Sequence, residues 1–290
     1  SQGGPPLNDP VTAVTSFSYE PVFNQVTSIT DPNNETTTIA YDGQGNPIQI
    51  EDTAGTRTTM VYGDANCPGQ LTSVTAADGL PEATTTSFTY DPATCNLLTT
   101  TDPLTETTTL SYDAAGNVTS ATDALTRTTT FGYDAQNRLT SVTDADAGLT
   151  TYAYDDAGNL TSVTDAETQE TTFAYDGLNR LERTTNPLTQ TQTFRYDAAD
   201  NLTETLDAAN QRITFGYDAA NQLTSKTLRD ATDSIVDTVT FQYDDVGNLT
   251  LAEDGDSTLS FTYDALDRLT EAETGDGIRA PAPDDPDLHL

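Results

Sequence analysis

Residues 152–164 read Tyr-Ala-Tyr-Asp-Asp-Ala-Gly-Asn-Leu-Thr-Ser-Val-Thr, and they contain every part of a pattern that recurs along the chain. Tyr152 and Tyr154 are two positions apart, which places both side chains on the same face of a β-strand. Residues 155–159 are turn formers, because Asp accepts hydrogen bonds from the backbone ahead of it and Gly or Asn tolerates a positive φ. Leu160 opens a second short run of Thr, Ser and Val, residue types that favour strands. The stretch therefore predicts a β-hairpin.

The hairpin pattern recurs about twelve times. Tyr19-Glu20 and Tyr62-Gly63 fill two gaps in an otherwise regular series of Tyr-Asp pairs, whose commonest spacing is about 21 residues. The Tyr-Asp pairs begin at Tyr41, Tyr90, Tyr112, Tyr133, Tyr154, Tyr175, Tyr196, Tyr217, Tyr243 and Tyr263. A second turn begins at an Asp after the second run, as in residues 123–127, so each repeat is strand, turn, strand, turn. These turns are too short for parallel crossovers.

We therefore expect an all-β fold in which tandem hairpins form one long curled or spiralling antiparallel sheet. A large apolar residue two positions before each repeat Tyr makes a ladder of side chains on one face, and we expect this ladder to be hidden from water as the core. The regular part of the ladder consists of Phe131, Tyr133, Tyr152, Tyr154, Phe173, Tyr175, Phe194, Tyr196, Phe215 and Tyr217. Leu160 and Val163 are three apart and cannot share a face of a regular strand, so a bulge or a twist is needed near the turn.

Three segments follow from this pattern: an N-terminal arm at residues 1–14, the repeat array at 15–274, and an acidic tail rich in Pro and Asp at 275–290. The chain starts at Ser1 without an initiator Met, which indicates either a removed signal peptide or a piece of a longer protein. The outer strands of the first and last repeats would leave unpaired backbone groups at both edges of an open sheet. Two compatible open edges favour head-to-tail stacking into a filament.

Composition narrows the classes of function. The chain has 11 Lys+Arg against 46 Asp+Glu, a formal net charge of −35, and Thr makes up about one residue in five. Such a charge makes nucleic acid and anionic membrane surfaces poor partners. A single His, two Cys and no Trp leave little for acid–base, nucleophilic or metal chemistry, so we expect no enzyme activity and no catalytic, cofactor or metal site. A high net charge suits an extracellular or high-salt protein, and we expect an extracellular or cell-surface location.

Cys67 and Cys95 each follow their repeat Tyr by five positions, in consecutive repeats with lengthened turns, and a disulfide between them is the favoured interpretation. Equivalent points in neighbouring hairpins are roughly 9–10 Å apart, beyond the reach of a disulfide, unless the longer loops lean together. Two free thiols are the alternative.

Other motifs favour plain structural interpretations. Paired Asp residues at 144/146, 155/156, 244/245 and 254/256 are first of all solvated turn carboxylates; structural calcium is a lesser possibility, and a pair of catalytic carboxylates is disfavoured because it would not repeat. Asn-x-Thr, the motif that can accept a glycan in a secreted protein, occurs at Asn34, Asn117, Asn159, Asn201 and Asn248. Four of these motifs arise from the repeat turn itself, which explains their presence without glycosylation. His289 lies in the tail with no obvious partner. A carbohydrate or cell-surface partner stays unidentified.

The pattern Tyr154-Asp-Asp-Ala-Gly-Asn-Leu-Thr161 resembles the YD-repeat or Rhs family, which includes bacterial Rhs toxins, insecticidal toxin-complex shells and teneurins. The resemblance covers nearly all of the array and implies a ribbon of hairpins that spirals into a hollow shell, often around a toxin. Family shells are much longer and end in a core with Asp-Pro-x-Gly motifs; no such motif follows Tyr263, so self-cleavage and a toxin payload are not carried over. We therefore expect a non-enzymatic extracellular structural protein that self-assembles head to tail into a filament or surface fibre. The alternative is a fragment of an Rhs-type shell that serves in encapsulation, adhesion or binding.

Overall fold

The computed structural model describes residues 13–275, and all regular elements in this range are β-strands. They belong to one antiparallel sheet of 24 strands, paired as twelve successive hairpins. The described range contains no helix that could span a membrane. Residues 1–12 of the predicted arm and residues 276–290 of the predicted tail, including His289, lie outside the described residues.

The strands are grouped in two compact units, one of which, unit 2, is a single continuous segment, Thr37–Gln192. Its strands are β3 (Thr36–Tyr41), β4 (Pro47–Glu51), β5 (Arg57–Tyr62), β6 (Leu71–Ala76), β7 (Thr84–Tyr90), β8 (Leu97–Thr101), β9 (Thr107–Tyr112), β10 (Val118–Thr122), β11 (Thr128–Tyr133), β12 (Leu139–Thr143), β13 (Leu149–Tyr154), β14 (Leu160–Thr164), β15 (Glu170–Tyr175) and β16 (Leu181–Thr185). Each odd-numbered strand ends at a repeat Tyr, so the hairpin predicted from residues 152–164 is β13–β14.

The other unit, unit 1, combines two segments that are distant in sequence, 13–36 and 193–275 within the described range. Its strands are β1 (Ala13–Tyr19), β2 (Val26–Thr30), β17 (Thr191–Tyr196), β18 (Leu202–Leu206), β19 (Arg212–Tyr217), β20 (Leu223–Arg229), β21 (Ile235–Tyr243), β22 (Leu249–Glu253), β23 (Thr258–Tyr263) and β24 (Leu269–Thr274). Ala13 and Val14, which the sequence places in the arm, are the first residues of β1.

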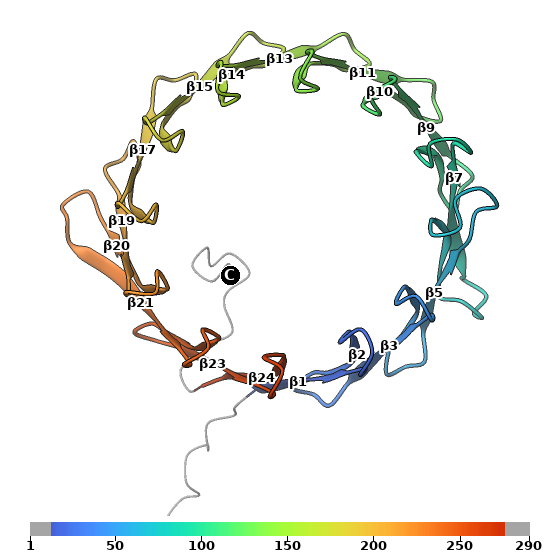
Figure 1. The fold of residues 1–290 in the computed structure, drawn as a ribbon, viewed down its shortest axis with the longest axis horizontal. Coiled ribbons are helices and arrows are strands. Elements are labelled where there is room, and N and C mark those ends of the chain that lie inside the picture. Colours follow the sequence, from blue (N-terminus) through green and yellow to red (C-terminus); the bar gives the residue numbers. More distant parts are fainter. Residues whose placement is uncertain (1–12, 276–290) are drawn as a thin grey trace, which may run out of the picture. The chain divides into compact units, whose positions relative to one another are not determined.

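The first and last strands pair with each other. In β1 and β24, Ala13 lies opposite Thr274 and Ser16 lies opposite Glu271 in an antiparallel register. Figure 1 shows β23, β24 and β1 side by side. The expectation of an open sheet with an unpaired edge at each end is therefore wrong: both terminal strands have partners on both sides. The physical reason is that the first and last repeats carry the same edge pattern as interior repeats, so each satisfies the other's free N–H and C=O groups.

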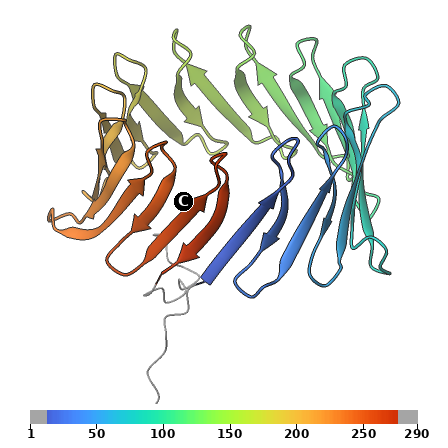
Figure 2. The same ribbon diagram turned by 60° about the horizontal axis from the view of Figure 1, so that its bottom comes forward.

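Leu160 and Val163 would lie on opposite faces of a regular strand. A one-residue bulge after the Tyr-Asp turn brings their side chains to the same face. In β13–β14, Tyr154 pairs with Leu160 and Ala153 pairs with Ser162, so Thr161 is an extra residue without its own partner. Tyr152 consequently pairs with Val163, and the four apolar side chains share one face. The same one-residue shift lies just before the repeat Tyr in all twelve hairpins. Figure 2 shows the repeated hairpins with a turn at each strand end.

The ladder is half-buried, not hidden from water. All ten predicted ladder residues, Phe131, Tyr133, Tyr152, Tyr154, Phe173, Tyr175, Phe194, Tyr196, Phe215 and Tyr217, are partly exposed. Among the described residues the only buried hydrophobic residue is Cys67, at 2% exposure. All described strands belong to one sheet, so no second layer covers the ladder within either unit and each ring is shielded mainly by its neighbours on the same face. The expected core is therefore wrong, although the register of the ladder is as predicted.

Candidate functional site: the Tyr-Asp turn

The hydroxyl of the repeat Tyr joins one hairpin to the hairpin before it. Tyr154 donates a hydrogen bond of 2.9 Å to the carbonyl oxygen of Leu139, the first residue of β12. Because β12 belongs to the preceding hairpin, this bond crosses from one repeat to the next. The same bond is made by the pairs Tyr90–Leu71, Tyr112–Leu97, Tyr133–Val118, Tyr175–Leu160, Tyr217–Leu202, Tyr243–Leu223 and Tyr263–Leu249. The Tyr therefore serves as a staple between repeats.

The surroundings of the staple keep the hydroxyl protonated. At Tyr175, burial raises the pKa of the phenol, and the negative charge of Asp155 in the preceding turn raises this pKa further. The same two causes raise the pKa of Tyr90, Tyr217, Tyr243 and Tyr263, each beside the Asp of the preceding repeat turn or loop. A raised pKa means that the proton needed for donation stays on the oxygen across the neutral and mildly alkaline range.

The Asp that follows each Tyr builds the turn. One carboxylate oxygen of Asp155, Oδ1, accepts the backbone N–H of Asn159 at 2.8 Å, and the other, Oδ2, accepts the side-chain amide of Asn159 at 2.9 Å. The side-chain bond and then the backbone bond from Asn159 are the main causes that lower the pKa of Asp155. Gly158, at φ +92°, supplies the left-handed residue of the turn. The carboxylate is thus occupied in backbone capping.

The last position of the turn contacts the following turn. Asn159 also donates through Nδ2 to Oδ1 of Asn179, at 3.0 Å. Asn117–Asn137, Asn201–Asn221 and Asn248–Asp267 make the same contact. In the turn between those of Asn117 and Asn159, an arginine contacts the following turn: Arg138 donates to the carbonyl oxygen of Asp155 at 3.4 Å. Its guanidinium also lies 4.5 Å from the centre of the Tyr154 ring, a cation–π contact between repeats.

These inter-turn contacts were not foreseen from the sequence, but a signal for them is present. Gly116-Asn117 and Gly158-Asn159 alternate with Asn137-Arg138 and Asn179-Arg180 in consecutive turns. The first type carries its left-handed position on Gly and the second on Asn, whose side chain then accepts the bond from the preceding turn. The pattern therefore repeats over two hairpins in this part of the chain.

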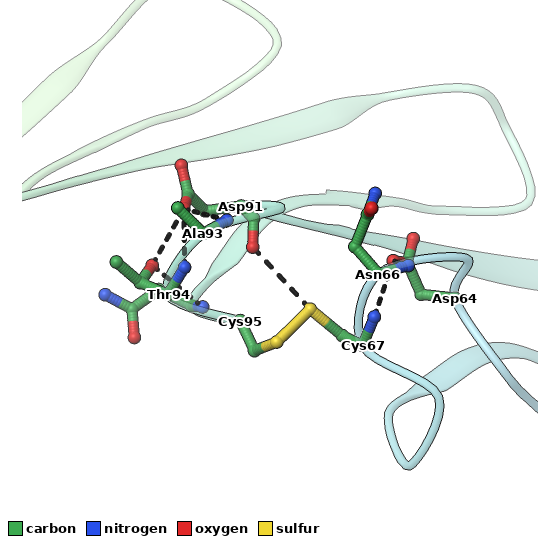
Figure 3. The surroundings of a disulfide bond; sticks show 8 residues. Asp64, Asn66, Cys67, Asp91, Ala93, Thr94 and Cys95 are labelled. Atoms are coloured by element: carbon green, nitrogen blue, oxygen red, sulfur yellow. Dashed lines mark hydrogen bonds between the residues drawn. A yellow bond between two sulfur atoms is a disulfide. The ribbon is translucent and has the colours of Figure 1, made fainter.

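The structure joins Cys67 and Cys95 by a disulfide with a Cα–Cα distance of 5.7 Å, inside the range that a bridge requires. The two residues lie in the lengthened loops after β5 and β7 (Figure 3). Asp64 accepts the N–H of Cys67 at 3.1 Å, and Asp91 caps its own turn through Thr94 at 2.8 Å. The loops therefore lean together and shorten the separation of two strand spacings that regular hairpins would impose. The bond links the turns of two consecutive repeats, as the Asn–Asn contacts do elsewhere in the array.

The remaining predicted motifs are placed as follows. Within residues 13–275 no group of three or more His, Cys, Asp or Glu side chains could hold a metal ion. The first Asp of each predicted pair accepts backbone amides of its own turn: Asp144, Asp155, Asp244 and Asp254.

In four of the Asn-x-Thr motifs the Asn side-chain amide bonds both to its own Asp and to the next turn: Asn117, Asn159, Asn201 and Asn248. Asn34 differs, since it lies in an exposed turn with φ +61°.

A comparison with curated proteins finds no significant match. Among solved structures, similar chains occur in the crystal structure of TcdB2-TccC3-Cdc42, with 17% identity and a TM-score of 0.48, and in that of TcdB2-TccC3 without its hypervariable C-terminal region, with 17% identity and a TM-score of 0.47. A third occurs in the Photorhabdus luminescens Tc holotoxin pore, with 18% identity and a TM-score of 0.40. Each alignment covers 89% of this chain, which spans 19%, 18% and 15% of those chains, respectively.

The family model described as RHS Repeat matches most of the array. The matches cover residues 22–57, 41–81, 90–128, 112–149, 154–191, 175–212, 196–233 and 243–279. They include the Tyr staples and the Asp-capped turns described above. The chain therefore belongs to the RHS repeat family.

Proposed function

We propose that this chain is a non-enzymatic structural protein whose RHS repeats build a wall segment of a shell, and that it works outside the reducing cytoplasm. The observation that carries the proposal is the use made of the Tyr and Asp side chains. The Tyr hydroxyl joins neighbouring hairpins, as Tyr154 does to Leu139, and the Asp carboxylate caps its own turn, as Asp155 does. Both side chains of the motif are thereby committed to building a continuous sheet.

The location part of the proposal is supported by the disulfide and by the charge. Disulfides persist in oxidising compartments and are rare in the cytosol. The Cys67–Cys95 bond and the formal net charge of −35 are both typical of proteins that work outside the cytoplasm.

The physical argument for a head-to-tail filament no longer holds. That expectation needed an unpaired edge on the first and last strands, and β1 and β24 pair with each other instead.

The wall function is tested by protease protection. The protein is digested with proteinase K, and the fragments are followed by mass spectrometry. A continuous wall predicts that residues 13–275 persist as one resistant fragment. The matched control replaces several staples at once, Tyr133, Tyr154 and Tyr175 by Phe, and should be cut faster within the array. Rapid cleavage within the array of the wild type, or equal rates for the wild type and this variant, would contradict the proposal.

A further inference from the structure

The joint between β1 and β24 repeats the contacts of interior joints. Tyr19 donates a hydrogen bond to the carbonyl oxygen of Leu269 at 2.6 Å, the staple that interior Tyr residues make to the preceding hairpin. The Arg268 guanidinium lies 4.7 Å from the centre of the Tyr19 ring and donates to Oδ1 of Asn24 at 3.0 Å. Arg138 makes the equivalent cation–π contact with Tyr154. The last repeat thus makes with the first repeat the same kinds of contact that an interior repeat makes with the repeat after it.

This joint differs from the others in its covalent connection. β23 and β24 are linked by the short turn 264–268, and the other consecutive strands in each unit are likewise linked through short turns and loops. Tyr19 and Leu269, by contrast, are 250 positions apart. Four residue pairs, from Ala13–Thr274 to Ser16–Glu271, form the ladder. The segment 13–36 is therefore held on the rest of unit 1 by non-covalent contacts.

From this we infer that the β1–β24 seam is an exchangeable interface whose partner is a second copy of this chain. The β1–β2 hairpin of one copy docks on β24 of the other, and the reverse pair forms at the same time. Each seam then keeps the same strand ladder, staple and Arg268 contacts. Because two copies exchange identical elements, the dimer retains all contacts of the monomer and differs mainly in hinge geometry and in the entropy of association.

The chemistry of the seam makes it selective for this chain. Antiparallel strand addition supplies the affinity through main-chain hydrogen bonds, and side chains at alternate positions supply the choice of partner. Here the selective groups are Tyr19 and Asn24 on one side and Arg268 on the other. A partner edge without an acceptor at the position of Asn24, or without an aromatic ring at the position of Tyr19, forfeits the contacts of the guanidinium.

Cysteine cross-linking between two differently labelled copies tests the inference. One copy carries Thr15→Cys and the other carries Ala272→Cys, positions that face each other across the seam. The copies are mixed at high concentration, warmed below the unfolding transition, diluted and oxidised. A disulfide-linked heterodimer whose yield rises with the concentration during mixing is expected. The buried Cys67–Cys95 bond stays oxidised throughout.

The control pair lies inside one hairpin. Ser260→Cys and Glu273→Cys face each other across β23–β24, which are joined by a turn, so copies carrying one change each should give no heterodimer. The double variant Thr15→Cys/Ala272→Cys should cross-link within one chain at low concentration, which establishes that the two thiols meet. Monomer alone from the mixed copies at every concentration, or a double variant that never cross-links, would overturn the inference.

The rate at which the β1–β2 hairpin exchanges between copies gives a second test, through variants of Arg268. Arg268→Gln removes the cation–π contact and the bond to Asn24 and should speed exchange of the hairpin by roughly tenfold. Arg127→Gln is the matched control, because among residues 13–275 the Arg127 side chain pairs only with Asp123 of its own turn. Equal exchange rates for the two variants would show that Arg268 does not hold the seam.

Discussion

At the scale of single residues, the Tyr and the Asp of each repeat have different structural roles. The Tyr ring lies on the ladder face while its hydroxyl reaches the preceding hairpin, and the Asp carboxylate satisfies the amides of the turn. Polar groups of a single-layer sheet stay close to water, so each such bond contributes modestly. Stability must therefore come from repetition of the same small contributions along the array.

Tyr154→Phe tests the staple. The change keeps the ring and removes the bond to Leu139, so the free energy of unfolding should fall by about 1 kcal/mol in urea titrations followed by circular dichroism. Tyr152→Phe is the control, because Tyr152 lies on the same face and strand and its hydroxyl makes no hydrogen bond among the described residues. Equal losses in the two variants would show that the hydroxyl bond has no special role.

Asp155→Asn tests the turn carboxylate through its pH dependence. The bonds from Asn159 hold the pKa of Asp155 below its usual value of 3.8, so its contribution is present above that value and is lost as pH falls through the lower pKa of the folded state. The stability difference between wild type and variant should be largest near neutral pH and should shrink below about pH 4. Asp156→Asn, at the exposed next position, is the control and should show little difference at any pH. A pH-independent difference for Asp155→Asn would contradict the assignment.

At the scale of elements, the two kinds of turn differ in backbone strain: the Tyr-Asp turns within hairpins are less strained than several of the turns that join one hairpin to the next. Four of the turns that join one hairpin to the next place a β-branched residue in the left-handed region, where Cβ crowds the backbone. Four Thr residues have φ between 62° and 68°: Thr105, Thr126, Thr168 and Thr189. Apart from Cys95, the left-handed residues of the described Tyr-Asp turns are Gly, Asn or Asp, which the left-handed region tolerates better.

Thr126→Gly should therefore stabilise the protein. Relief of the left-handed strain outweighs the added flexibility of the unfolded chain, for a net gain of roughly 0.5–1 kcal/mol in the free energy of unfolding. The exposed Thr126 side chain makes no hydrogen bond among the described residues. Thr129→Gly, within β11, should instead destabilise the protein. Chemical denaturation of both variants decides the matter, and destabilisation by both would mean that the turn is not strained.

The disulfide should contribute more than any single turn. The two cysteines are 28 positions apart, and closing a loop of that length in the unfolded chain is worth about 3–4 kcal/mol. We expect the double variant Cys67→Ser/Cys95→Ser to lose this amount in equilibrium unfolding. In wild type, the 2% exposure of Cys67 should make the bond slow to react with dithiothreitol in native buffer. A double variant as stable as wild type would show that the loops meet without the bond.

At the scale of the whole molecule, the most prominent feature is the negative charge. Forty-six acidic residues against eleven basic ones give a formal net charge of −35, and many of the acids lie in turns that recur at a fixed spacing. Repulsion among like charges opposes the folded state, and dissolved salt weakens it because the screening length falls with ionic strength. The sheet also lacks a large apolar core within the described residues to offset this repulsion.

Melting temperature should therefore rise steeply with salt. Differential scanning calorimetry in NaCl from about 0.05 to 1 M should show a monotonic increase, since the screening length shortens from more than 10 Å to about 3 Å. Sucrose at matched osmolality is the control for general exclusion effects and should raise the midpoint less. A melting temperature that does not depend on salt would mean that the turn carboxylates are neutralised locally.

The amino-acid sequence by itself determined the hairpin repeat, its antiparallel strands and the side-chain ladder, because these depend on local periodicity and on turn residues such as Asp155, Gly158 and Asn159. It also singled out Cys67 and Cys95, whose equivalent positions follow from the repeat. The one-residue bulge at Thr161, the staple from Tyr154 to Leu139 and the contact of Asn159 with Asn179 became visible only in three dimensions. The pairing of β1 with β24 and the half-exposed state of the ladder were likewise decided by tertiary structure. The physical reason is that local rules specify a strand and its turn, whereas the neighbour of a terminal strand and the cover of a sheet face depend on where distant segments come to lie.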